Sequence, residues 1–161
     1  MRFFRSAPRV LLAQAAEADA LAELYRRAWV GCERLLDARL AAHEASAPAE
    51  VASWFVGGFE VFRIRHEDAV IGAVRCCFPS STCLIDRLAV DPQARGRGVG
   101  HLLLDHAVGR ARRAGVTRVW AQVSPKLVTA HALFRSFGFR DASRFSAAYW
   151  GEDLLLLELP V

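Results

Sequence analysis

An apolar run from residue 84 leads into the loop Asp91-Pro92-Gln93-Ala94-Arg95-Gly96-Arg97-Gly98-Val99-Gly100, which an amphipathic stretch follows without a break to residue 115. The glycines remove the side chains that would keep a ligand away from the backbone. If the amphipathic stretch is a helix, its first N–H groups lack internal partners and lie at the positive end of the helix dipole. Arg95 and Arg97 add positive charge. The loop therefore predicts a site for a phosphate-bearing anion.

The glycine spacing separates this loop from two other phosphate-binding loops. Glycines at 96, 98 and 100 give G-x-G-x-G, whereas the dinucleotide-binding fingerprint is G-x-G-x-x-G. The Gly-Lys-Ser/Thr ending of the P-loop is missing as well. The position of the loop, between a strand-like run and a helix-like run, carries more weight than the glycines alone.

The rest of the chain predicts an α+β fold. We expect strands at residues 10–13, 59–65, 69–78, 82–90, 116–123, 139–150 and 153–159, and helices at residues 17–30, 98–114 and 124–137, with shorter helical pieces between residues 32 and 57. Ser124-Pro125 would supply the cap and the first residue of the last helix. This order predicts a mixed, mainly antiparallel sheet with helices on both faces, in one domain spanning residues 1–161.

Charge is distributed unevenly along the chain. The net charge is +4, and of the 21 basic residues only Lys126 is a lysine. Acids outnumber bases in residues 17–58, whereas bases prevail in residues 91–150. This suits a polyanionic ligand in one half and a cationic one near the other, although solvated helix faces would give the same pattern. We expect no nucleic-acid partner.

Compartment and metal content follow from the apolar runs and the cysteines. No run reaches the ~18 apolar residues of a membrane span, and the N-terminal run is too short for a signal peptide, so we expect a cytoplasmic protein without a membrane partner. The four cysteines form no C-x-x-C pair. We interpret them as reduced core residues and expect no metal site.

The loop resembles the hallmark Q/R-x-x-G-x-G/A of the GNAT superfamily of acyl-CoA-dependent N-acetyltransferases, with Gln93, Gly96 and Gly98 in register. Ala130 and Gly138-Phe139 resemble the second signature of that superfamily. In that signature the usual asparagine and tyrosine positions hold Leu127 and Phe134. The resemblance implies a GNAT-like fold and acetyl-CoA as cosubstrate.

Residues that would bind acetyl-CoA are carried over from this resemblance. The backbone of Leu88 and Val90 would run along the pantetheine arm as a neighbouring strand does, and could also receive the oxyanion of the reaction. The full expected set is Leu88, Val90, Arg95, Gly96, Arg97, Gly98, Val99, Gly100, His101 and Phe134.

Acetyl transfer to an amine requires the amine to be neutral. An alkyl ammonium with a pKa of ~10.4 loses its proton at pH 7 at a cost of about 4.6 kcal/mol, so a general base is expected. Asp86 is the first candidate, and an ion pair with Arg87 or another basic neighbour is the alternative reading. Glu23 and Glu33 are further candidates from the acceptor side.

The departing thiolate needs less help, because a thiol with a pKa of ~8.5 is only ~1 to 2 units from neutral pH. With phenylalanine at position 134, the usual acid of the family is missing. His131, Tyr149, Tyr25 or water would then supply the proton, and a hydrogen-bonded structural role is the alternative for His131.

We therefore expect direct transfer of acetyl from acetyl-CoA to a primary amine, a small molecule or a peptide, in a ternary complex. A covalent intermediate on Cys77 or Cys83 is left open, as is a homodimer. The resemblance places the segments of Trp29, Trp54 and Trp150 around the acceptor cleft, where they would form an aromatic wall, with ordinary packing as the alternative. The competing hypothesis is a non-catalytic acyl-CoA-binding or regulatory module.

Overall fold

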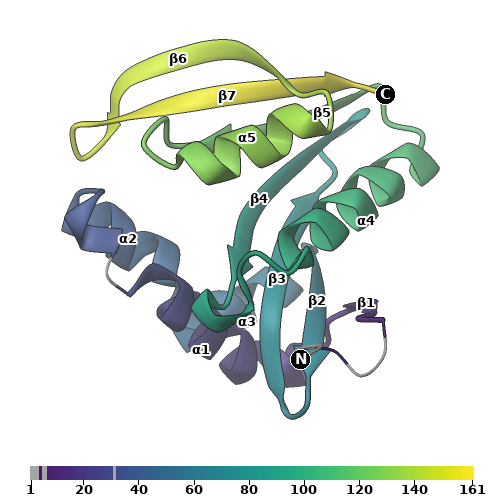
Figure 1. Ribbon diagram of the computed structural model, residues 1–161. Helices are drawn as coiled ribbons and strands as arrows, with labels where there is room; N and C mark the ends of the chain where they lie inside the picture. Colours follow the sequence, from purple (N-terminus) through teal and green to yellow (C-terminus); the bar gives the residue numbers. More distant parts are fainter. Residues whose placement is uncertain (1–3, 5–6, 31) are drawn as a thin grey trace.

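The computed structural model describes residues 4, 7–30 and 32–161, with the side chain of Glu33 outside the described part. Figure 1 shows one twisted sheet with helices packed against it. In chain order the strands and helices are β1 (Val10–Leu12), α1 (Ala18–Trp29), α2 (Ala38–Ala45), α3 (Pro48–Val56), β2 (Glu60–His66), β3 (Ala69–Cys77), β4 (Thr82–Val90), α4 (Val99–Arg113), β5 (Arg118–Val123), α5 (Val128–Ser136), β6 (Arg140–Tyr149) and β7 (Glu152–Pro160).

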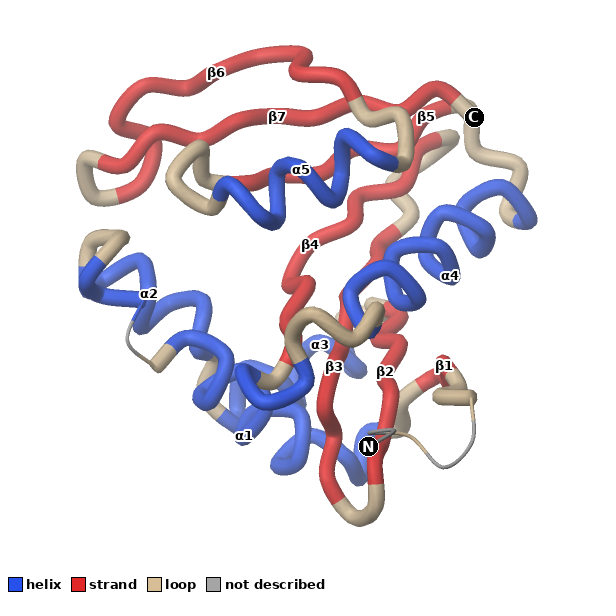
Figure 2. The backbone as a smooth tube through the Cα atoms, in the orientation of Figure 1, coloured by secondary structure: helices blue, strands red, loops and turns tan. Residues whose placement is uncertain are grey.

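The sheet has seven strands in the order β1-β2-β3-β4-β5-β7-β6. Every neighbouring pair is antiparallel except β4 and β5, which are parallel and are connected through α4. A parallel pair needs such a crossover, whereas the antiparallel pairs β2–β3, β3–β4 and β6–β7 are joined by short turns. Figure 2 shows the long strands β6 and β7 at one end of the sheet and β1 at the other.

Two apolar clusters cover the two faces of the sheet. Neighbouring residues of β2 point to opposite faces, so Val61 packs towards α1 and α3 while Phe62 packs towards α4. Leu103 of α4 and Phe134 of α5 belong to one cluster, and Tyr25 of α1 belongs to the other. The predicted α+β fold, with a mainly antiparallel sheet and helices on both faces, is confirmed.

The beginning of α5 differs from the prediction. Ser124 and Pro125 were expected to open this helix, but α5 begins at Val128. The intervening residues form a turn instead: the Leu127 N–H donates to the Ser124 carbonyl at 3.0 Å, and the Lys126 N–H donates to Ser124 Oγ at 3.2 Å. Ser124 therefore caps a turn and not the helix.

The four cysteines are free thiols. Cys76 and Cys83 are fully buried on neighbouring strands, where Cys76 is hydrogen-bonded to Cys83. Cys32 and Cys77 are half-buried. Within the described ranges, no helix is long and apolar enough to cross a membrane, and no group of three or more His, Cys, Asp or Glu side chains is arranged to hold a metal ion.

Candidate active site

The glycine loop occupies the turn between β4 and α4. Asp91 begins it by accepting from the Gln93 N–H at 2.9 Å, and Arg27 of α1 holds the other Asp91 oxygen at 2.7 Å. Gly96 and Gly98 both adopt positive φ, 72° and 81°. A Cβ built on either of them would meet nothing within 4 Å. The backbone there is open to a ligand, and L residues would strain it.

Helix α4 presents its N-terminus to this loop. Its first internal bond runs from the Leu102 N–H to the Gly98 carbonyl at 3.0 Å, so the N–H groups of Val99, Gly100 and His101 precede the helical ladder. Those donors lie at the positive end of a 15-residue helix. The His101 ring packs 4.7 Å from the Phe137 ring. The arrangement fits the diphosphate of a CoA molecule.

The two arginines of the loop bond to backbone carbonyls. Arg95 donates to the Ala28 carbonyl of α1 at 2.8 Å and to the Val90 carbonyl at 3.4 Å. Arg97 donates to the Gln93 carbonyl at 3.2 Å. Arg95 therefore also anchors the loop to the end of α1, a role that the sequence analysis did not assign to it.

Beside the loop, the sheet splits. Residues 82–85 of β4 lie opposite residues 118–121 of β5, whereas residues 86–90 have no register partner in β5 within the described chain. Figure 1 shows this part of β4 diverging from the group formed by β5, β6 and β7. Leu88 and Val90, the predicted pantetheine-binding residues, both lie in the diverging part. Their strand thus has an open edge directly before the glycine loop.

The diverging part of β4 contains a β-bulge. Ala73 of β3 faces Ala89, but Arg75, two residues later, faces Asp86, so β4 carries one extra residue there. Arg87 lies in the bulge and has a φ of 50°. This left-handed conformation is costly for a side chain as large as arginine, so surrounding contacts must maintain it.

Contacts from three helices hold Arg87. The Tyr25 hydroxyl of α1 donates to the Arg87 carbonyl at 2.7 Å. The guanidinium forms ion pairs with Glu44 of α2 at 3.1 Å and Glu50 of α3 at 3.2 Å, and donates to the His43 carbonyl at 3.1 Å. With its side chain only 7% exposed, Arg87 joins the helices of one face to the edge of the split.

Asp86, the predicted general base, forms an ion pair with Arg75. Nε and Nη2 of the Arg75 guanidinium donate to the two carboxylate oxygens at 2.8 and 2.6 Å. The guanidinium also stacks over Trp54 at 4.6 Å and over Phe59 at 4.2 Å. The basic partner of Asp86 is therefore the residue opposite it on β3 and not Arg87. Trp54 is 3% exposed and belongs to the core, so it does not wall an acceptor site.

The three candidate acids have different surroundings. His131 Nε2 lies 2.7 Å from an Asp141 oxygen, which ties α5 to β6. Tyr149 is 41% exposed at the end of β6. Tyr25 is fully buried, and burial raises the pKa of its hydroxyl. Phe134, at the usual tyrosine position, is buried and packs edge-to-face with Phe139 at 5.2 Å between ring centroids.

The remaining candidates are less well placed. Glu23 is an exposed partner of Arg26, and their hydrogen bond lowers the Glu23 pKa to about 2, which leaves it a weak base. Glu33 lies outside the described side chains. Cys83 is fully buried, and burial raises the pKa of the Cys77 thiol. Both conditions disfavour a cysteine nucleophile.

The β6–β7 hairpin reaches across to α2 through Glu152. Its carboxylate accepts from the Lys126 ammonium at 2.8 Å and from the Asp37 N–H, just before α2, at 2.8 Å. Next to it, the Trp150 ring packs 5.8 Å from the His43 ring of α2. We call these three contacts of the hairpin tip the clasp.

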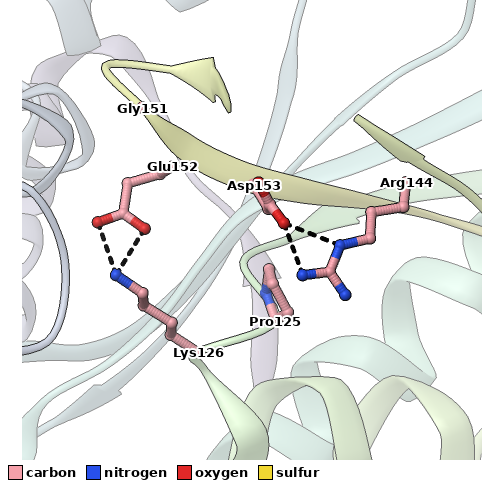
Figure 3. Close-up of a pocket in the computed structure, with 6 residues that line it drawn as sticks. All are labelled: Pro125, Lys126, Arg144, Gly151, Glu152 and Asp153. Atoms are coloured by element: carbon pink, nitrogen blue, oxygen red, sulfur yellow. Dashed lines mark hydrogen bonds and ion pairs between the residues drawn. The ribbon is translucent and has the colours of Figure 1, made fainter. Parts of the chain in front are cut away.

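A pocket of about 370 Å³ adjoins the clasp. Figure 3 shows that two ion pairs line it, Lys126 with Glu152 and Arg144 with Asp153. Its lining residues are Pro125, Lys126, Arg144, Gly151, Glu152 and Asp153. Because its charges are already paired, the pocket does not by itself indicate a ligand.

Sequence reasoning did not identify Arg75, Glu152 or the bulge. Arg75 is one of many arginines, and its pairing with Asp86 depends on strand register. The role of Tyr25 at the bulge was equally hidden, because its spacing from Leu21 is that of an ordinary core residue. An apolar strand interrupted by Asp86-Arg87 was the one available signal.

Comparison with known proteins identifies the family. The model of the Acetyltransferase (GNAT) family matches residues 18–139, and the chain belongs to this family. The [Ribosomal protein bS18]-alanine N-acetyltransferase of Salmonella typhimurium is 33% identical over 78 residues, which are 46% of this chain and 53% of that protein. Streptothricin acetyltransferase of Streptomyces lavendulae is 32% identical over 81 residues, 47% of this chain and 43% of that protein. The chain thus spans about half the length of the curated relatives it matches.

Solved structures share the fold over nearly the whole chain. The ribosomal-protein-S18-alanine N-acetyltransferase from Escherichia coli has a TM-score of 0.79 at 20% identity, covering 96% of this chain and 94% of that one. PaiA N-acetyltransferase from Thermoplasma acidophilum, solved in complex with coenzyme A, has a TM-score of 0.81 at 12% identity, covering 97% of this chain and all of that one. At these identities the likeness establishes the fold alone.

Proposed function

We propose that the protein transfers an acetyl group from acetyl-CoA to a primary amine by direct attack in a ternary complex. The observation that carries the proposal is the open edge of β4 at residues 86–90 immediately before the glycine loop and the N-terminus of α4. Acetyl-CoA, when bound, would supply the thioester. Family membership and the coenzyme A complex of the Thermoplasma acidophilum protein support this choice of cosubstrate.

Each part of the site has an assigned task in this proposal. The N–H groups of Val99, Gly100 and His101, with the open backbone of Gly96 and Gly98, bind the diphosphate, and Arg95 and Arg97 fix the loop. Leu88 and Val90 bind the pantetheine through their backbone. Phe134 contributes through packing, because it has no hydroxyl with which to protonate a thiolate.

Proton transfer is assigned to Asp86 as the base and to His131 or Tyr149 as the acid. Asp86 takes the amine proton, directly or through water, because two oxygens bonded to Arg75 still have lone pairs for a further donor. His131 or Tyr149 returns a proton to the thiolate. The acceptor is a small amine or a peptide amine. The names of two relatives illustrate the two classes: one is an N-acetyltransferase for a protein alanine, the other an acetyltransferase for the small molecule streptothricin.

A second function is favoured by the same residues. Asp86 is engaged by Arg75, His131 by Asp141, and position 134 lacks a hydroxyl. A non-catalytic acyl-CoA-binding module would tolerate all three. Its expected behaviour is binding of acetyl-CoA without turnover.

A thiol-release assay separates the two functions. The purified protein and acetyl-CoA are tested with peptide N-termini, lysine side chains, polyamines and aminoglycosides, and the melting temperature is measured with and without acetyl-CoA. Turnover on one acceptor class supports the enzyme. A raised melting temperature without turnover supports the binding module, because a ligand of the native state must stabilise it. An unchanged melting temperature at millimolar acetyl-CoA contradicts both.

A further inference from the structure

Tyr25 is a fully buried hydroxyl that the proposed chemistry does not use. It lies on α1, and the Trp54 ring packs against it edge-to-face at 5.5 Å and 85°. Burial raises its pKa, so the hydroxyl stays protonated and donates. Its acceptor is the carbonyl of Arg87, 62 residues away in the chain, at 2.7 Å.

That carbonyl belongs to the peptide between Arg87 and Leu88, at the bulge of β4. All described peptide bonds are trans, and in a planar trans peptide the C=O and the following N–H point in opposite directions. Because Tyr25 holds the carbonyl towards α1, the Leu88 N–H points away from α1. Leu88 has no register partner in β3 or β5.

Two sets of contacts hold Arg87, but only one acts on this peptide. The ion pairs with Glu44 and Glu50 act on the far end of the side chain. The Tyr25 hydroxyl touches the peptide oxygen itself. Rotation of the peptide would break this bond and leave the buried Tyr25 hydroxyl without its acceptor, which is unfavourable. The hydroxyl therefore fixes the direction of the Leu88 N–H.

We infer that Tyr25 is a positioning residue that aims the Leu88 N–H at the carbonyl oxygen of the acetyl group in the split of the sheet. This inference rests on the proposed binding of acetyl-CoA and adds a residue to it. A preset N–H donor is most effective where negative charge develops on such an oxygen. Tyr25 itself touches neither substrate.

The variant Tyr25→Phe tests this by calorimetric titration with two probes, acetyl-CoA and CoA. Both probes would use the glycine loop, but only acetyl-CoA has the acetyl carbonyl. We expect acetyl-CoA to bind about two- to tenfold more weakly to the variant, the range of one neutral hydrogen bond, with CoA affinity unchanged. Leu24→Val is the matched control, since it thins the same core on the same helix and keeps the hydroxyl. Both affinities should be unchanged in that control.

Equal weakening of acetyl-CoA and CoA in Tyr25→Phe, or no weakening of either, overturns the inference. If the wild-type protein binds neither probe, the proposed function itself fails, which is a different result. The wild-type protein also provides a test that does not depend on the variant's folding. In protein labelled with ¹⁵N-leucine, the Leu88 amide proton should move downfield with acetyl-CoA relative to CoA. Identical Leu88 signals with the two ligands would contradict the inference.

Discussion

Gly98 determines how the chain enters α4. It is the N-cap of the helix, with a φ of 81° and open space where a Cβ would be. Gly115, just beyond the end of the same helix, has a φ of 71° and equally open surroundings. Both positions therefore require a left-handed backbone conformation, but only Gly98 belongs to the predicted diphosphate site. This makes them a matched pair for separating binding from stability.

Substituting alanine for either glycine should cost a similar amount of stability, about 1–2 kcal/mol, because both positions require a left-handed backbone. Gly98→Ala should also reduce the rise in melting temperature caused by acetyl-CoA, since a methyl group would enter the open space proposed for the diphosphate. Gly115→Ala should retain the full rise. Thermal melts with and without acetyl-CoA measure both effects, and equal ligand-induced rises in the two variants would disprove the role of Gly98.

Among the elements, α4 packs closely on β3 at Gly72. A Cβ there would lie 2.5 Å from Val99 Cγ1 and 2.9 Å from Leu103 Cδ1. Real side chains do not approach so closely, so the helix would have to move away from the strand. Gly109, on the same helix, offers a contrast, because a Cβ there would meet only the flexible end of Arg113 at 3.3 Å.

We therefore expect Gly72→Ala to destabilise the protein by about 1–3 kcal/mol through overpacking. Gly109→Ala should stabilise it by up to about 1 kcal/mol, because alanine is the better helix former. Chemical denaturation of both variants measures the change in the free energy of unfolding, which should fall for Gly72→Ala and rise for Gly109→Ala. A neutral Gly72→Ala would mean that α4 does not pack on β3 as described.

The clasp leads to a prediction about hydrogen exchange. Glu152→Gln should weaken the bonds to Lys126 and to the Asp37 N–H, so amide exchange at the start of α2 should accelerate. Asp153→Asn is the control, because Asp153 pairs with Arg144 and accepts from Ala147 within the hairpin and does not contact α2. Faster exchange at α2 in both variants, or in neither, would contradict the role given to Glu152.

The clasp should also respond to acid. The hydrogen bond from Lys126, followed by that from the Asp37 N–H, lowers the pKa of Glu152 from its ordinary value of 4.5. A carboxylate with a depressed pKa contributes its full stabilisation above the unfolded value and loses it as the pH falls through the folded value. Exchange at α2 should thus be constant above about pH 4.5 and rise only below it, after correction for the intrinsic exchange rate.

Local sequence patterns were enough to predict most of these elements. The strands β2, β3 and β4 and the helix α4 each lie within a residue or two of their predicted ranges, because their periodicity and glycines are local signals. The start of α5 was wrong, since the choice between a turn and a helix cap at Ser124 depends on bonds that composition does not reveal. The pairing of Asp86 with Arg75 depends on register across two strands, so it required the structure.

At the scale of the whole molecule, two parts meet at the split. One part is built from α1, α2, α3 and β1 to β4, and the other from β5, α5, β6 and β7, with α4 crossing between them. Four pairs of residues join their strands, and the clasp ties their far ends together. The excess of acids in residues 17–58 lies within the first part, whereas five of the ten basic residues in 91–150 lie in the glycine loop and α4, between the two parts. The charge pattern of the sequence therefore does not follow the division of the sheet.

The strand order β5-β7-β6 has a consequence for how the sheet forms while the chain is being synthesised. β6 is made before β7, yet β7 lies between β6 and the rest of the sheet. Until β7 inserts, the ten residues of β6 have no strand to pair with, and the core lacks the side chains of Leu155, Leu157 and Leu159. A chain stopped at residue 151 should therefore expose apolar surface and bind a dye such as ANS, whereas one stopped at residue 160 should not. Strand β7 thus completes the sheet for the strand that precedes it in the chain.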